Sequence, residues 1–199
     1  MRTITVTGHG TAAVVPDRAV VRVSAVHRAA TLAEALAGAS SAGAAVTSAA
    51  KAHVDAARVA SRELSVWPAH DHEGRQSGFE ARHAYTLTCG DLDVAGALVT
   101  ELAAQVGDRL QVEGVSLEVS DTSAAVSAAR EAAYADARAR AEHLARLADV
   151  ALGDVQSLVE GGAAAPAARG FEVMAKADVV LEPGEGSLGQ SLTVTWALG

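Results

Sequence analysis

The longest uninterrupted helical pattern in the chain runs from Asp121 to Val150 and contains neither proline nor glycine. Most of its residues are alanine, leucine, arginine or glutamate, which favour helices. Because alanine dominates its apolar side, we expect one long helix whose backbone lies close against a sheet, with Val126, Ala133 and Leu144 buried and Arg138 exposed. Apolar residues at spacings of three and four form this narrow stripe: Val126, Ala129, Ala133, Ala137, Leu144 and Ala148.

Alternation of apolar and polar residues predicts strands on both sides of this helix. The Gly8-His9-Gly10 segment is expected to end the first strand in a turn, with a close backbone approach or a bulge as the alternative. The first two strands are close enough in sequence to form an antiparallel pair. Polar residues 68–78 are expected to form the long tip of a hairpin, and residues 161–170 a low-complexity loop. The expected strands cover residues 3–7, 19–27, 62–67, 82–89, 110–119, 154–160, 177–181 and 190–198.

Two further helices have recognisable first turns. Thr31 and Glu34 have the spacing of a capping box, which opens a helix expected to end near Ala57. Asp91 or Asp93 can cap a shorter helix that Gly107 ends. Paired strands separated by three helices predict an α+β fold, with an antiparallel sheet covered by helices on one side. We expect a single domain over residues 1–199, with a hint of an imperfect internal duplication.

Charge and hydropathy exclude several classes of protein. The formal net charge of −8 argues against a nucleic-acid-binding protein, which usually carries a basic patch. No apolar run approaches the ~18 residues of a membrane-spanning helix. The first residues, MRTITVTGHG, hold no apolar run of signal-peptide length. The chain is therefore expected to be cytoplasmic, or else a mature form whose leader has been removed. Cys89 is the single cysteine, which excludes an intrachain disulfide.

The densest group of metal-ligand side chains lies at residues 70–73, in the expected hairpin tip. His70 and His72 alternate there, and His83 or Cys89 could approach from the neighbouring strand. A zinc site needs three or four such ligands. The more ordinary interpretation is a solvated tip with polar side chains, so His70, His72 and His83 are only candidates. Cys89 shares a strand face with apolar residues, which favours a buried and inert thiol.

Two other patterns have ordinary explanations. The glycines Gly184, Gly186 and Gly189 match a dinucleotide-binding fingerprint, but a strand follows them where that fingerprint requires a helix. A turn is therefore expected at these glycines. In the long helix, arginines and acidic residues interleave, and the pairs Asp136–Arg140 and Glu142–Arg146 have the favourable i,i+4 spacing. This pattern predicts a solvated helix face.

Four stretches together resemble the SIMPL-domain family, which includes bacterial periplasmic immunogenic proteins. They are VTGHGTAAVVPDRAVVRVSAV, RHAYTLTCGDLD, VEGVSLEVSD with the following AREAAYADARARAEHLARLADVALGDV, and LEPGEGSLGQSLTVTWAL. The resemblance spans nearly the whole chain. It implies an α+β fold and ring-like homo-oligomers, and relatives are commonly exported to the bacterial envelope. The family supplies no agreed catalytic residues, so none is assigned.

The expected function is therefore that of a non-enzymatic scaffold or interaction protein of SIMPL type that forms a homo-oligomer. Its strand and helix patterning is regular, and no chemical motif agrees with its structural context. No cofactor is expected, and neither nucleic acid nor an integral membrane segment is implied. The alternative is a metal- or small-ligand-binding protein, or an enzyme, that uses the His70/His72 loop.

Overall fold

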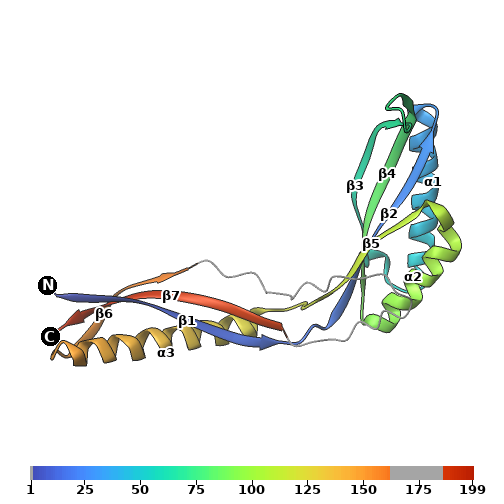
Figure 1. The fold of residues 1–199 in the computed structure, drawn as a ribbon. Helices are drawn as coiled ribbons and strands as arrows, with labels where there is room; N and C mark the ends of the chain where they lie inside the picture. The colour runs from blue at the N-terminus through green and yellow to red at the C-terminus, as the bar shows by residue number, and fades with distance from the viewer. Residues whose placement is uncertain (1, 162–185) are drawn as a thin grey trace. The chain divides into compact units, whose positions relative to one another are not determined.

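A computed structural model describes residues 2–161 and 186–199, so most of the loop expected at 161–170 and the strand expected at 177–181 lie outside the described residues. The described chain has an α+β fold, as predicted (Figure 1). None of its described helices is both long and apolar enough to cross a bilayer. The elements are β1 (Thr3–Val14), β2 (Arg18–Ala29), α1 (Leu32–Ala50), η1 (Ala56–Arg58), β3 (Val59–His70), β4 (Gln76–Cys89), α2 (Leu92–Val106), η2 (Gly107–Arg109), β5 (Leu110–Glu118), α3 (Ser123–Leu147), β6 (Leu152–Glu160) and β7 (Gly186–Leu198).

The strands form two antiparallel sheets rather than one, in two compact units. Unit 1 comprises Met1–Pro16 and Val119–Gly199, with the strand order β1-β7-β6, and unit 2 comprises Asp17–Glu118, with the order β3-β4-β2-β5. The expected pairing of the first two strands is wrong, because β1 pairs with β7 along its whole length while β2 lies between β4 and β5. The two described sheets differ in strand number and order and so do not support an internal duplication. The duplication stays a prediction.

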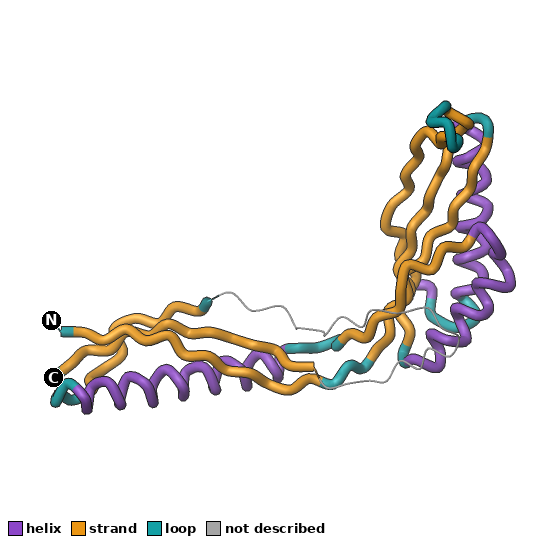
Figure 2. Tube along the Cα trace, in the orientation of Figure 1, coloured by secondary structure: helices purple, strands orange, loops and turns teal. Residues whose placement is uncertain are grey.

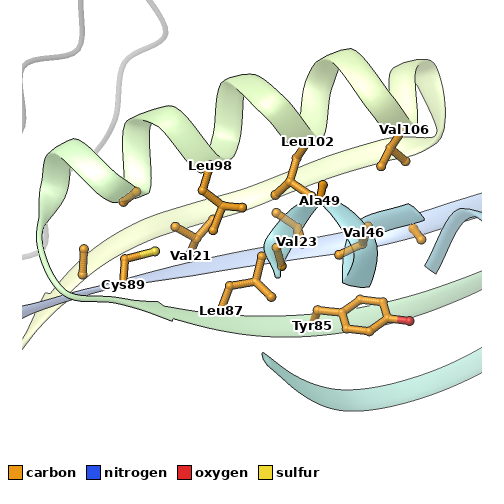
Figure 3. Close-up of a cluster of buried hydrophobic side chains, with 14 of the residues drawn as sticks. Val21, Val23, Val46, Ala49, Tyr85, Leu87, Cys89, Leu98, Leu102 and Val106 are labelled. Carbon is orange, nitrogen blue, oxygen red and sulfur yellow. The ribbon is translucent and has the colours of Figure 1, made fainter. Parts of the chain in front are cut away.

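Unit 2 buries one face of its sheet beneath α1 and α2 (Figure 3). The alternation of β2 predicted this face correctly, since Ala19, Val21, Val23 and Ala25 are all fully buried. Figure 3 shows Leu98 and Leu102 of α2 pointing toward Val21, Val23 and Leu87. The helix starts follow the expected chemistry: the Thr31–Glu34 capping box is formed, and the Asp91 carboxylate accepts the backbone N–H of Val94.

Two boundaries in unit 2 differ from the expectation. Helix α1 ends at Ala50 rather than near Ala57, because the N–H groups of Ala52 and His53 bond to the carbonyl oxygens of Ala49 and Ala50, three residues earlier, and tighten the chain into a turn. The β3–β4 hairpin is confirmed, but its tip is shorter than residues 68–78, because the strands stay paired out to His70 and Gln76. The Asp71 carboxylate accepts two backbone N–H groups and closes the turn.

In unit 1, α3 lies along the strands of the sheet (Figure 2). Its buried residues recur at every fourth position: Ala129, Ala133, Ala137, Ala141 and Ala145. A spacing of four drifts by about 40° per step in a straight helix, and the twist of the strands compensates for this drift. Leu144 lies about 100° away from Ala145 around the helix, and it is 44% exposed, so the prediction that it is buried is wrong.

The other predictions for α3 have mixed outcomes. Ala133 is buried and Arg138 is exposed, as expected, whereas Val126 is only half-buried and Ala148 is exposed. The i,i+4 pair of Asp136 and Arg140 is formed at 3.0 Å. Glu142, however, pairs with Arg138 at 2.9 Å, so the expected pairing of Glu142 with Arg146 is wrong. Arg138 reaches Glu142 from the preceding turn, which is also an i,i+4 spacing.

The expected turn at Gly8-His9-Gly10 is also wrong, because β1 continues through these residues to Val14. Both glycines face the backbone of α3. A Cβ atom at Gly8 would overlap the carbonyl oxygen of Ala133, and one at Gly10 would overlap that of Ala129. The glycines therefore let the helix backbone approach the strand, which is the close approach that an alanine-rich helix allows.

Candidate functional site

One face of the three-stranded sheet is covered by α3. On the opposite face, the described residues of β1 and β7, together with the β6 residues paired to them, include no lysine, arginine, aspartate or glutamate. Even-numbered residues of β1 and β7 point toward α3, so the odd-numbered ones point away from it. Residues of β6 that stand directly opposite them share their face. We call this surface the hydroxyl face; it consists of Thr3, Thr5, Thr7, His9, Thr11 and Ala13 of β1, Ser187, Gly189, Ser191, Thr193, Thr195 and Ala197 of β7, and Ser157 and Val159 of β6.

Threonine hydroxyls on this face bond to one another across the strands. The Oγ1 atoms of Thr5 and Thr195 are 2.9 Å apart, and those of Thr7 and Thr193 are 2.8 Å apart. In each pair one hydroxyl donates to the other, so part of the hydrogen-bonding capacity is satisfied within the face. Burying such a face costs less free energy than burying the same hydroxyls without partners.

The edge of the sheet at β1 is closed by α3. The backbone N–H of His9 donates to Asp136 Oδ2 at 2.8 Å, and Arg140 Nη1 donates to the carbonyl oxygen of Thr7 at 3.3 Å. Unpaired groups on an edge strand can recruit another strand, and side chains that occupy them prevent this. The ion pair of Asp136 and Arg140 therefore blocks strand addition at the middle of β1.

The opposite edge, β6, exposes large apolar side chains. Val155, Leu158 and Val159 are 43%, 51% and 60% exposed. Val159 stands opposite Thr193 and therefore belongs to the hydroxyl face, where it extends the uncharged surface. Neighbouring exposed apolar side chains of this size are a common feature of interaction surfaces.

The structure does not bring the candidate metal ligands together. His70 is the last residue of β3 and His72 lies in the hairpin turn with its side chain 90% exposed. His83 stands opposite Leu64, six residues before His70 on β3, which is roughly 20 Å along the strand. Within residues 2–161 and 186–199, no group of three or more His, Cys, Asp or Glu side chains is placed to hold a metal ion.

His83 instead belongs to a hydrogen-bonded chain. Its Nε2 lies 2.5 Å from Ser61 Oγ, and its Nδ1 lies 2.8 Å from the Tyr85 hydroxyl, so both ring nitrogens are engaged. Burial lowers the pKa of His83. Burial likewise raises the pKa of Tyr85, and a hydrogen bond to Thr47 opposes this rise. Both ring nitrogens have protein partners, so His83 is engaged within unit 2 and does not join His70 or His72 in a metal site.

The remaining sequence candidates have structural roles. Cys89 is fully buried in the unit 2 core, as predicted, and burial raises the pKa of its thiol, so it is not a reactive thiolate. Gly186 and Gly189 lie within β7, so the expected turn is wrong at these two positions, and Gly184 lies outside the described residues. A strand at this position cannot present a helix N-terminus to phosphate, so the glycines do not form a dinucleotide site.

The hydroxyl face was not predicted from the sequence, although part of its signal is visible there. Threonine recurs at alternate positions in the first strand, at Thr3, Thr5 and Thr7, and again in the last, at Thr193 and Thr195. Alternation places each set on one face of its own strand. Only the pairing of β1 with β7 joins the two sets into one surface.

Comparison with known proteins identifies a family but no activity. The model of the SIMPL family, described as a protein of unknown function (DUF541), matches residues 4–196. The match therefore includes strands of both units. A search of curated proteins found no significant match to this chain.

Proposed function

The chain belongs to the SIMPL family, and we propose that it acts there as a non-enzymatic scaffold that associates with further copies of itself through the hydroxyl face. The observation that carries this proposal is the absence of lysine, arginine, aspartate and glutamate among the paired strand residues of this described face, in a chain in which 20% of residues are charged. Depletion of charge is a property of the buried centres of protein interfaces.

Charge also favours a second copy as the partner. The chain has a net charge of −8, so two copies repel each other in most relative orientations. The hydroxyl face is a surface through which identical chains can meet without placing like charges in contact. Hydrogen bonds between its paired threonines lower the free-energy cost of removing water from the face. The threonine methyl groups and the exposed Val159 can then make apolar contacts.

The dimensions of the face suit such a contact. Strands lie about 4.8 Å apart and rise about 3.3 Å per residue, so three strands with the twelve residues of β1 cover roughly 500 Å². Two copies packed face to face would bury about 1,000 Å² in total, which is the lower limit for a specific interface. The exposed side chains of β6 would enlarge this area.

We expect Thr193→Lys to convert the oligomer into a monomer. Thr193 lies on the central strand, between Thr7 and Val159, so a lysine there would have to lose its water at the middle of the interface. Light scattering coupled to size-exclusion chromatography at micromolar concentration should give a multiple of 20.1 kDa for the unsubstituted chain and 20.1 kDa for the variant.

The matched control is Thr100→Lys, which makes the same chemical change at an exposed position of α2. We expect this variant to keep the oligomeric mass. Fluorescence of the buried Trp196 should be unchanged in both variants if unit 1 remains folded. A strict monomer for the unsubstituted chain, or an oligomer that Thr193→Lys leaves intact, would contradict the proposal.

A further inference from the structure

We propose that Ser61 is an activated hydroxyl that accepts an acyl group from an activated ester, with His83 as the base that takes its proton. Ser61 is exposed on β3, the edge strand of the unit 2 sheet, and its Oγ lies 2.5 Å from His83 Nε2. A serine paired in this way with a histidine has the geometry of an activated nucleophile. The proposal is independent of the association through unit 1.

The proposal places the hydrogen of His83 on Nδ1. Each ring nitrogen has one hydroxyl partner: Nε2 has Ser61 Oγ, and Nδ1 has the Tyr85 hydroxyl at 2.8 Å. To serve as the base for Ser61, His83 must donate its Nδ1–H to the Tyr85 oxygen, which has lone pairs to accept it.

In this tautomer, His83 Nε2 carries a lone pair directed at Ser61. Burial lowers the pKa of His83, so the imidazole is mostly neutral at pH 7 and this lone pair is available. A neutral imidazole that donates through Nδ1 and accepts through Nε2 is the form that a general base requires.

The surrounding backbone holds this arrangement in place. A Cβ atom at position 43 would overlap the Tyr85 hydroxyl, so the glycine in α1 makes room for the chain of hydrogen bonds. The ladder between β3 and β4 shifts register between Ser61 and Glu63, next to the serine. Such irregularities re-aim side chains and occur frequently beside reactive groups.

The reaction is a stoichiometric transfer. Ser61 Oγ attacks the carbonyl carbon of the ester while its proton passes to His83 Nε2. The carbon–oxygen bond to the leaving group then breaks, and the leaving alkoxide or phenoxide takes the proton from His83. The chain keeps one ester on Ser61 and His83 returns to its neutral form, with no oxidant or reductant required.

The test is to treat the full-length chain with p-nitrophenyl acetate at pH 7 and to locate the acetyl groups by peptide mass spectrometry over time. We expect Ser61 to be acetylated at least about 100-fold faster than Ser77, an exposed serine of β4 that has no hydrogen bond to a histidine among the described residues, because a positioned general base contributes a factor of this size. Ser61→Ala should remove the fast phase of p-nitrophenolate release.

Two variants test whether Ser61 reacts fast because His83 activates it or only because it is exposed. His83→Gln should slow acetylation of Ser61 by about 100-fold or more, to the rate of Ser77. Tyr85→Phe keeps the ring but removes the acceptor for Nδ1–H, so it should slow Ser61 without affecting Ser77. If Ser61 and Ser77 react at the same rate in the unsubstituted chain, the proposal is wrong, whether or not the variants fold. An unchanged rate in a folded His83→Gln chain would also overturn it.

Discussion

Gly8→Ala and Gly10→Ala should each lower the free energy of unfolding of unit 1 by about 3 kcal/mol or more. A methyl group at either glycine would overlap backbone atoms of α3, which cannot rotate away as a side chain can. The helix must therefore move from the sheet, and this movement separates the buried alanine stripe from β1 and β7. Overpacking of a close-packed interior typically costs about 1–3 kcal/mol, and a clash with backbone lies at the upper end or beyond.

The two tryptophans allow unit 1 to be followed by itself. Trp196 is 3% exposed in the unit 1 core, and Trp67 lies on β3 in unit 2. With Trp67→Phe as the background, urea unfolding monitored by fluorescence reports on unit 1 alone. The glycine variants should unfold at a lower urea midpoint with an unchanged slope.

Gly96→Ala is the matched control for this prediction. Nothing lies within 4 Å of a Cβ atom built at Gly96, which is in the middle of α2. Alanine is favoured over glycine in a helix by up to about 1 kcal/mol, so we expect unit 2 to become slightly more stable by hydrogen exchange. Stability of Gly8→Ala within about 0.5 kcal/mol of the parent chain would show that α3 does not approach β1 as closely as described.

Features that depend on a few neighbouring residues could be predicted from the sequence. The caps at Thr31 and Asp91 were correct, because an N-cap bond forms within one turn of chain. The buried face of β2 was correct because alternation places residues on a strand face whatever the partner is. The close approach of an alanine-rich helix to a sheet was also expected, and Ala129, Ala133 and Ala137 lie in that contact.

Features that depend on pairing between distant segments could not be predicted. Thr7 meets Thr193 only because β1 pairs with β7, and neither strand carries a local signal of its partner. His83 was considered together with His70 and His72 because all lie near one hairpin, but the register places His83 opposite Leu64. The burial of Leu144 was predicted wrongly, because the residues that a straight helix buries differ from those buried by a helix that follows a twisted sheet.

Glu113 joins three strands on the open face of the unit 2 sheet. Its Oε1 accepts hydrogen bonds from the hydroxyl of the fully buried Ser24 and from Arg82 Nη2, the latter at 2.6 Å. Arg82 Nε also donates to Ser24 Oγ at 2.8 Å. Glu113→Gln should lower the free energy of unfolding of unit 2 by about 1–3 kcal/mol, because the buried Ser24 and the half-buried Arg82 lose a charged acceptor.

The loss of stability in Glu113→Gln should depend on pH, and the contacts of Glu113 determine the direction of this dependence. The Ser24 hydrogen bond, followed by the Arg82 hydrogen bond and the charges of Arg82 and Arg62, holds the pKa of Glu113 below its usual value, and partial burial opposes them. A carboxyl whose pKa is lower in the folded chain adds stability above its unfolded pKa and loses it as pH falls through the folded pKa. The difference between the parent chain and Glu113→Gln should therefore be constant at neutral pH and shrink below about pH 4.5.

Glu73→Gln is the matched control, because it removes a carboxylate that has no buried hydrogen-bond partner among the described residues. Glu73 pairs with Arg75 at 2.9 Å in the hairpin turn, where its side chain is 49% exposed, so its ion pair should contribute less than about 1 kcal/mol. Urea unfolding between pH 3 and 8, followed by Trp67 fluorescence in a Trp196→Phe background, compares both variants with the parent chain. Equal losses for the two variants would mean that Ser24 and Arg82 do not depend on the Glu113 charge. A loss for Glu113→Gln that is as large at pH 3 as at pH 8 would assign its effect to the shape of the side chain rather than to ionisation.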